Sequence, residues 1–460
     1  MAMVVKNNMS AVNTLNTLNK NQSELSKSLQ KVSSGMKINS AGDDASGMAI
    51  SERMRVQIRA LDQDDNNTKN GSALLRTAEG AVQSTIEILK TLKEKAINAA
   101  NDTNTDEDRR LIQKEVDKLI DQIDENALTT YNGKYLIDGT KNGLVVGESG
   151  AGTQTSFTNM SLATNTNGLT QLVRLKRRDG NDVGIDSNDT LTASWVKNGV
   201  TYTGTLSPIG TGTVTNMISL ITSQHATFHS TGADVGVDEY GRTVYTPDNQ
   251  PALTIRARND GVDGQVTAIT FAVTDKEGKM RNEVNAVLDD FRETVRAQNP
   301  SPDNSLVLQT GTKSNQAVKV GFTDMRSVAL GLQSADGAGW NHVMPTPTPP
   351  VTIDVVGSGP KIQVTTKEAA NAAINAFQNA LIRATDQAVA IGAVQNRLGF
   401  TSSNLVVASE NVQASESTIR DADMAKEMTA YTKHNVLTQS AQAMLAQANQ
   451  NSSAVLSLLQ

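Results

Sequence analysis

The chain has 460 residues, carries a formal net charge of −6 and contains no cysteine. So small a charge gives no reason to expect nucleic acid as a partner, and without cysteine there are no disulfides or thiolate metal sites. Aromatic residues make up only 3% of the chain, so its core must be filled by aliphatic side chains, which favours helices packed on helices. No apolar run is long enough for a membrane span, and the opening segment MAMVVKNNMS lacks the long apolar core of a secretory signal. Composition alone would place the chain in the cytosol.

The N-terminal region has the heptad pattern of a helix that packs along another helix. Its seam positions recur in steps of four and three, at Val4, Asn8, Ala11, Leu15, Leu18, Gln22, Leu25, Leu29, Val32 and Met36. Gly35 is expected to end this helix, because glycine adopts positive φ without steric cost.

Two further helices are predicted before the composition changes. Asp43 and Asp44 precede the first of them, which runs to about Ala100, and their expected role is capping rather than catalysis. Its polar middle, QDDNNTKNG, either packs weakly or awaits a neighbour. Thr105 and Asp108 resemble a capping box at the start of the next helix, which ends near a turn at residues 131–133.

From residue 138 glycine, threonine, asparagine and valine dominate and the helical period disappears. Three strand pairs are predicted, at 191–204 with its turn at Asn198-Gly199, at 253–273 and at 306–325. Short helices are expected at 217–221 and 284–295, and the prolines between 345 and 350 mark an extended loop.

Helical periodicity returns at about Thr366 and leads into a C-terminal heptad pattern. Its seam positions are Leu437, Ala441, Met444, Ala448, Asn451, Val455 and Leu458. The expected fold is therefore mainly α with a β-rich insert: the N- and C-terminal regions form a long coiled-coil bundle, and the insert forms an α+β outer domain. The two ends either pair only within one subunit or meet each other and also copies of themselves.

Long blocks near both ends carry a family resemblance. They are VSSGMKINSAGDDASGMAISERM (32–54), GSALLRTAEGAVQSTIEIL (71–89), IRDADMAKEMTAYTKHNVL (419–437) and MLAQANQNSSAVLSLLQ (444–460). In these blocks the chain closely resembles bacterial flagellin, the subunit of the flagellar filament. LQTGTKSNQAVKVGFTDMRSVALGL (308–332) is similar to the inner β-hairpin of that family. The resemblance covers roughly residues 1–140 and 306–460.

The resemblance implies three domains and a structural function. Residues 1–42 and 416–460 would form a terminal coiled-coil domain in the filament inner core, and 43–140 with 306–415 a helical bundle with a β-hairpin in the outer core. Residues 141–305 would form a variable β-rich surface domain. The expected subunit polymerises into the helical filament for swimming motility. It leaves the cell unfolded through the flagellar type III apparatus, without a cleaved signal peptide, and is extracellular.

The resemblance also implies partners. They are neighbouring copies, an export chaperone at the C-terminus, the filament cap and the hook-associated proteins, with neither nucleic acid nor membrane insertion. The residues expected to form the self-assembly seam are Leu15, Leu18, Leu25, Leu29, Val32, Leu437, Met444, Val455 and Leu458.

An animal Toll-like receptor is a further expected partner. The receptor-activating helix of the family usually reads Gln-Arg-Val-Arg-Glu-Leu-Ala-Val, and here it reads KTLKEKAI (90–97). Thr91 replaces an arginine and Lys95 replaces a leucine, so weak or absent activation is expected. The residues that would face the receptor are Lys90, Thr91, Glu94, Lys95, Ile97 and Glu115, which also have a plain role in packing between protofilaments.

No catalytic motif or cofactor site is predicted. His225 and His229 in HATFH would share a helix face, but Ala226 stands where a zinc protease has glutamate, so no metal site is expected. Ser and Thr residues of the insert either carry O-linked glycans or serve solubility. The alternatives within and outside this machinery are a hook–filament junction protein and an adhesin built on a flagellin scaffold.

Overall fold

The computed structural model describes residues 8–147, 150–222, 226–232, 234–334 and 361–458, without the side chains of 222–233 and 452–458. The chain forms two compact units. The first is made of Met1–Lys69, Gln309–Gln316 and Gly399–Gln460, and the second of Asn70–Leu308 and Ala317–Leu398. Two long helices, α2 (Ala45–Ala99) and α6 (Lys367–Arg420), contribute residues to both.

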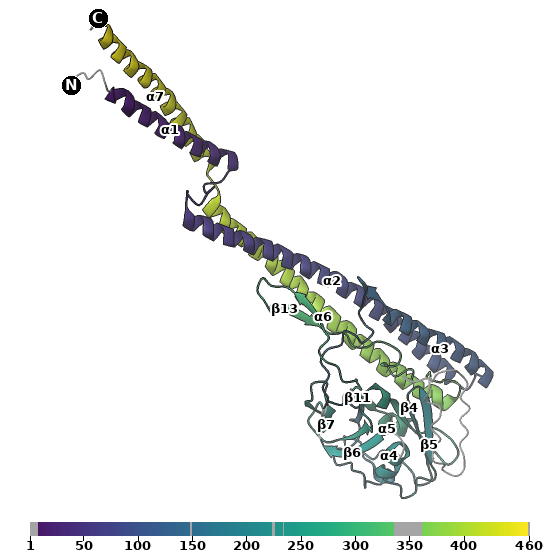
Figure 1. Cartoon of the computed structure of the whole chain (residues 1–460). Helices are drawn as coiled ribbons and strands as arrows, with labels where there is room; N and C mark the ends of the chain where they lie inside the picture. The colour runs from purple at the N-terminus through teal and green to yellow at the C-terminus, as the bar shows by residue number, and fades with distance from the viewer. Residues whose placement is uncertain (1–7, 148–149, 223–225, 233, 335–360, 459–460) are drawn as a thin grey trace. The chain divides into compact units, whose positions relative to one another are not determined.

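The first unit contains an antiparallel pair of helices built from the two ends of the chain. Helix α1 (Met9–Ser34) lies beside α7 (Met424–Leu458), so that the N- and C-terminal ends of the pair lie together (Figure 1). The side-chain amide of Asn8 donates to the carbonyl of Ala448 at 3.1 Å, and that of Asn21 donates to the carbonyl of Leu437 at 3.4 Å. The predicted pairing of the two terminal regions is confirmed.

The helix ends in this unit follow the predicted capping chemistry. Gly35 ends α1 with φ of 70°, and its N–H donates to the carbonyl of Lys31. The Asp44 carboxylate accepts the N–H of Gly47 at 2.9 Å and so caps α2, while Asp43 accepts the N–H of Ser40 at 3.0 Å in the preceding turn.

The helical stripe that leads toward the C-terminus is interrupted between α6 and α7. Helix α6 ends at Arg420, and Asp423 accepts the N–H of Ala425 at 3.0 Å at the start of α7. A bridge between Met36 and Asp421, with the N–H of Ala422 donating to the carbonyl of Gly35 at 2.9 Å, ties this break to the end of α1. Aspartates that bond the backbone ahead of them favour a new helix start over continuation.

The second unit is built on an aliphatic core shared by α2, α3 (Asp106–Ala127) and α6. Its largest members are leucines and isoleucines, joined by Phe322 and Phe377. The predicted capping box of α3 is present, because the Thr105 hydroxyl accepts the N–H of Asp108 and the Asp108 carboxylate accepts the N–H of Thr105. Two hairpins, β1–β2 (Thr130–Tyr131, Lys134–Tyr135) and β12–β13 (Leu306–Gln309, Ala317–Val320), follow the predicted turns.

The insert holds two main sheets and a small hairpin. One sheet has the order β10-β4-β5, and the other has the order β11-β3-β9-β6. Helices α4 (Val214–Thr222) and α5 (Asn282–Leu288) pack on them around a second aliphatic core. The strands are β3 (Ser156–Asn159), β4 (Thr190–Lys197), β5 (Val200–Leu206), β6 (Ala226–Gly232), β9 (Ala252–Ala257), β10 (Val266–Thr274) and β11 (Phe291–Val295), with β7 (Asp234–Val237) and β8 (Thr243–Tyr245) as the hairpin.

Two predictions for the insert are wrong. Residues 253–273 supply two strands, but β9 and β10 belong to different sheets, because the connection between them turns through Gly261 with φ of 75° and a short 3-10 helix at Val262–Gly264. The helix expected at 284–295 ends at Leu288, and Phe291–Val295 is strand β11, which pairs with β3. The predicted hairpin at Asn198-Gly199 is confirmed, with φ of 51° and 74° at these two residues.

Candidate assembly surface

Small side chains make the most deeply buried part of the α1–α7 contact, with leucine and valine side chains of α1 half-buried beside them. The most buried side chains along it are those of Ser28, Thr438, Ala441 and Ala448. Small residues let the two helices approach but remove little apolar surface from water, and burial stabilises in proportion to that area. The helix pair therefore gains little stability from its own contact.

Large apolar side chains lie beside this contact and remain exposed. Leu15, Leu29, Leu437 and Met444 are 45%, 52%, 39% and 63% exposed. Sequence reasoning missed other exposed residues of this kind, among them Val12 and Val436, which lie one position from the heptad seam. An apolar stripe of this kind on a helix marks a protein-interaction surface. No charged residue follows His434 in the sequence, so this surface is uncharged along much of α7.

The other residues of the predicted seam divide in two groups. Leu18, Leu25 and Val32 are half-buried in α1, at the positions that face α7. Val455 and Leu458 lie within α7, but their side chains are outside the described residues. The predicted seam thus contains residues of the intrachain contact and residues left free for other partners.

Arg420 holds the joint between the terminal helix pair and the start of α2. Its guanidinium donates to Glu52 at 2.7 Å and to the Ser51 hydroxyl at 3.2 Å, and its carbonyl accepts the N–H of Lys37 at 2.7 Å. The hydrogen bond that Glu52 accepts from the Arg420 guanidinium lowers the pKa of the Glu52 carboxyl. Sequence reasoning missed Arg420, because nothing in the local pattern links it to residues more than 360 positions away.

The polar middle of α2 packs against α6 through serines. Asp62 accepts from Ser409 at 3.0 Å, and Asp65 accepts from Ser402 at 2.5 Å. Asp64 between them is buried, burial raises the pKa of its carboxyl, and its Oδ2 atom has no hydrogen-bond partner among the described residues. The polar middle of α2 therefore packs against α6 of the same chain.

The residues expected to face an innate receptor lie on α2 and α3. Lys90, Glu94 and Ile97 are exposed and follow one face of α2, whereas Thr91 and Lys95 are half-buried. The Lys95 ammonium pairs with the Glu115 carboxylate of α3 at 2.8 Å. Lys95, which stands in place of the usual leucine, thus forms an ion pair with Glu115, the acid expected to face the receptor.

The insert is fixed to α6 by a row of polar contacts. Asn379 donates to the carbonyl of Thr267 at 2.8 Å. Arg383, only 4% exposed, donates through Nε to Glu293 at 3.1 Å and through Nη1 to the carbonyl of Ala329 at 2.9 Å. Such fully satisfied buried contacts hold the insert rigidly on the helix.

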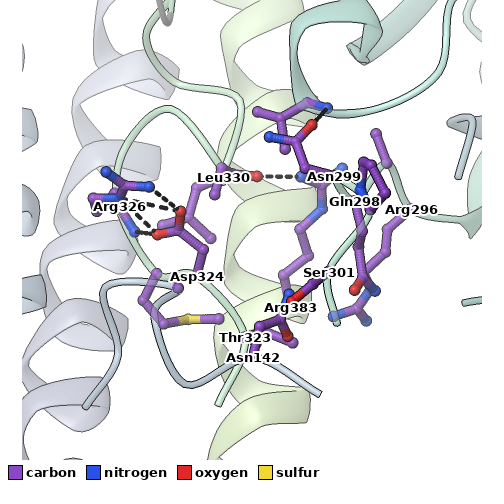
Figure 2. Close-up of a pocket in the computed structure, with 16 residues that line it drawn as sticks. Asn142, Arg296, Gln298, Asn299, Ser301, Thr323, Asp324, Arg326, Leu330 and Arg383 are labelled. Carbon is purple, nitrogen blue, oxygen red and sulfur yellow. Dashed lines mark hydrogen bonds and ion pairs between the residues drawn. The ribbon is translucent and has the colours of Figure 1, made fainter. Parts of the chain in front are cut away.

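A cavity of about 200 Å³ lies beside these contacts (Figure 2). It is lined by three arginines, and each of them pairs with a carboxylate. Arg296 pairs with Asp386 at 2.6 Å, Arg326 with Asp324 at 2.6 Å, and Arg383 with Glu293. The cationic groups around this cavity are therefore neutralised, which leaves it without the excess positive charge that would bind an anion.

The described residues offer no metal centre. His229 lies in strand β6 rather than on a helix, so HATFH does not place two imidazoles on one helix face, and His225 lies outside the described residues. No group of three or more His, Asp or Glu residues in the described part of the chain is placed to hold a metal ion. None of the described helices combines the length and apolarity that crossing a membrane requires.

Comparison with known proteins identifies the family to which the terminal helices belong. The bacterial flagellin N-terminal helical region matches residues 5–142, and the flagellin C-terminal helical region matches residues 374–459. A flagellin of Clostridium tyrobutyricum is 33% identical over 453 residues, which covers 97% of this chain and 99% of the relative. The chain belongs to the flagellin family. It is also 29% identical to the flagellin of Bacillus subtilis, over 99% of this chain and 100% of the relative.

The chain is therefore a structural subunit of the bacterial flagellar filament, as the resemblance predicted. Solved structures of FliC from Burkholderia pseudomallei and FlgL from Xanthomonas campestris are 18% and 14% identical, with TM-scores of 0.25 and 0.31. They cover 71% and 80% of this chain and 99% of their own chains. Superpositions this loose carry no weight in choosing between a filament subunit and a junction protein, whereas the full-length relatives favour the filament subunit.

Proposed function

We propose that the two chain ends form the core of the filament by contacts between copies. Residues 1–42 and 416–460 then build the inner core, 43–140 and 306–415 the outer core, and 141–305 the outer surface. The observation that carries this proposal is the exposed apolar stripe on α1 and α7 beside a contact of small residues. Head-to-tail contacts between identical subunits that do not close give an open helix, which is a filament.

Removing Asn449–Gln460 tests this proposal directly. The truncated chain is expected to stay soluble as a monomer and to lose polymerisation, because the end of α7 no longer covers a neighbour. Electron microscopy under polymerising conditions is the measurement, and Gln450→Ser in the full-length chain is the control, expected to polymerise normally because Gln450 is exposed and polar. Filaments of normal length from the truncated chain would contradict the proposal.

The same helices support a proposal for export. The chain leaves the cell unfolded through the flagellar type III apparatus, without a cleaved signal peptide, and an export chaperone holds its C-terminus. Ordering a backbone costs about 1–2 kcal/mol per residue, and a seam whose most buried side chains are alanine, serine and threonine offsets little of that in a monomer. The terminal helices therefore order on assembly with neighbours, the filament cap or the hook-associated proteins. The helical circular-dichroism signal is expected to rise on polymerisation, and an unchanged signal would contradict this.

The role proposed for the chain is structural, with no catalysis, no metal and no cofactor. The full-length flagellin relatives support a structural role.

The innate receptor is proposed as a weak partner. Thr91 offers no forked cationic donor, and Lys95 places a paired cation where an apolar contact is usual. The double variant Thr91→Arg with Lys95→Leu is expected to raise the response of receptor reporter cells well above that of the natural chain. The control is Lys114→Leu, an exposed lysine of α3 outside this set, which is expected to leave the response unchanged. Full potency of the natural chain would contradict the proposal.

A further inference from the structure

Every methionine of the helices α1 and α7 lies on their surface. The chain has 14 methionines and no cysteine, so the thioether is its only sulfur group and the side chain that peroxides oxidise most readily. Those of α1 and α7, which we call the surface methionines, are Met9, Met424, Met428 and Met444, and they are 62%, 44%, 46% and 63% exposed. Their sulfur atoms are therefore open to small oxidants in a free subunit.

Methionines elsewhere in the described chain have other surroundings. Met217 and Met325 are buried in the two aliphatic cores. Met280 lies on the insert between β10 and α5, and it is exposed. The chain thus offers buried methionines and an exposed methionine outside the terminal helices, against which the surface methionines can be compared.

Met444 lies beside the α1–α7 contact. It stands between Ala441 and Ala448, both of which are buried in that contact, yet its own side chain remains exposed. No charged residue follows His434 in the sequence, so the surface around Met444 is uncharged. Methionine is unbranched and polarizable, which lets it fit contacts of irregular shape. The position and chemistry of Met444 both suit a contact with a neighbouring subunit.

Oxidation makes such a side chain polar. A peroxide transfers one oxygen atom to the thioether: a sulfur lone pair forms the new S–O bond, the O–O bond breaks, and the peroxide is reduced to water or an alcohol. A covered sulfoxide oxygen requires a hydrogen-bond donor, and leaving it without one is costly. Apolar side chains of the same surface, such as Leu437, donate no hydrogen bond. Sulfoxide formation therefore opposes burial of this surface.

We propose that the surface methionines are an oxidation site that controls assembly. Peroxide oxidises them in the free subunit, and the oxidised subunit no longer polymerises. In a formed filament neighbouring subunits cover them, so they resist the same oxidant. Oxidation thus stops the growth of a filament and leaves the existing filament intact. This inference rests on the proposed function, because it requires neighbouring copies to cover the exposed surfaces of α1 and α7.

The first experiment measures protection by assembly. Hydrogen peroxide is applied to full-length monomers and to filaments, and peptide mass spectrometry measures the oxygen gained by each methionine over time. The surface methionines are expected to oxidise at least about tenfold more slowly in filaments, because oxidation follows exposure. Met280 of the insert is expected to oxidise at similar rates in both states, and the buried Met217 and Met325 slowly in both.

The second experiment measures polymerisation after oxidation. Oxidised natural subunits are expected to show a critical concentration at least about tenfold above that of untreated subunits. Leucine keeps the apolar volume without the sulfur, so the chain with all four surface methionines changed is expected to show no rise when compared with its own untreated sample. That chain carries Met9→Leu, Met424→Leu, Met428→Leu and Met444→Leu. Met280→Leu is the matched control and is expected to keep the full peroxide sensitivity.

A polar substitution tests the same idea without an oxidant. Met444→Gln is expected to raise the critical concentration, because the amide opposes burial as a sulfoxide does, whereas Met280→Gln is expected to leave it unchanged. No effect of Met444→Gln would overturn the inference, and so would a peroxide sensitivity that persists in the four-leucine chain.

The two experiments separate this inference from the proposed function. Normal polymerisation of oxidised subunits, with the surface methionines still protected in filaments, would overturn the inference and leave the assembly surface in place. Equal oxidation rates of the surface methionines in monomers and filaments would contradict the assembly surface itself, and the inference with it.

Discussion

Asp289 lies where the insert meets α6, with its carboxyl mostly buried. The N–H of Phe271 donates to it at 3.2 Å and the amide of Asn375 at 3.4 Å, and both stabilise the ionised form. Burial opposes them and dominates, raising the pKa of Asp289 to about 6. Ionisation of Asp289 therefore lowers the stability of the folded state.

This cost predicts a pH dependence. Below about pH 3, Asp289 is protonated in both the folded and the unfolded state, so its burial costs little. Between about pH 4 and 6 the folded state binds more protons, so the free energy of unfolding falls as pH rises, and above pH 6 the full penalty of about 2–3 kcal/mol remains. Asp289→Asn, which carries no charge, is expected to be more stable than the natural chain at pH 7.5 by up to that amount.

The measurement is denaturant unfolding of both chains at pH 4.5 and pH 7.5. The advantage of Asp289→Asn is expected to shrink at the lower pH. Asp263→Asn, at an exposed aspartate, is the control and is expected to show no such trend. An advantage that is equal at both pH values would contradict this account of Asp289.

Helices α1 and α7 each carry two adjoining surfaces, one that contacts the other helix and one that we propose contacts neighbouring subunits. The first uses small side chains such as Ala441 and Ala448, and the second exposes large ones such as Leu29 and Met444. The division explains why a single heptad pattern contains both kinds of residue.

Serine substitutions at two leucines of α1 separate these surfaces. Leu29→Ser is expected to leave monomer stability nearly unchanged, because the side chain is exposed, and to raise the critical concentration for polymerisation. Losing the burial of one leucine, about 1.5–3 kcal/mol, corresponds to roughly a 10- to 150-fold rise. The control Leu25→Ser, at a half-buried position facing α7, is expected to weaken the α1–α7 contact within each assembled subunit as well. Sedimentation of filaments measures the critical concentration, and no change for Leu29→Ser would contradict the assignment of its surface.

Local chemistry made several elements predictable from sequence. The turn at Asn198-Gly199, the capping box at Thr105 and Asp108, and the glycine end of α1 each depend on residues close together in the chain. The separation of β9 from β10 was not predictable, because both strands are largely buried on both faces and only their three-dimensional neighbours decide which sheet each joins.

The candidate assembly surface was predictable only in part for the same reason. A heptad pattern marks large apolar residues such as Leu437 and Met444, but the contact within the chain uses Thr438 and Ala441 beside them. Periodicity shows that a helix has partners and does not show which partner covers which residue. The sequence around Arg420 and Arg383 does not indicate their ion pairs, because the carboxylate partner of each arginine lies far away in the sequence.

At the scale of the whole molecule, the insert and the helices of the second unit share a core. Val196 and Ala268 of the insert belong to the same buried cluster as the residues of α2, α3 and α6. Together with the Arg383–Glu293 pair, this makes the insert part of the subunit rather than a tethered module.

Breaking the buried pair tests this integration. Glu293→Gln leaves the Arg383 guanidinium without its carboxylate, and loss of one partner of a buried pair costs about 3–5 kcal/mol. The connections of the insert near Gly143 and Pro302 are then expected to be cleaved faster in limited proteolysis. Asp386→Asn is the matched control, because its pair with Arg296 is largely exposed and contributes about 0–1 kcal/mol. Equal cleavage rates for the two variants would contradict a rigidly held insert.

The stacked pair of Trp195 and Tyr202 gives this chain a built-in optical probe. Trp195 is 3% exposed, lies in β4, and stacks on Tyr202 of β5 with ring centroids 5.7 Å apart. The other tryptophan, Trp340, lies outside the described residues. The emission of Trp195 thus follows the sheet of the insert, while far-ultraviolet dichroism is dominated by the long helices. In a Trp340→Phe chain, in which Trp195 is the sole tryptophan, recording both signals on one sample during assembly separates a change in the sheet of the insert from the ordering of the chain ends, without attaching a label.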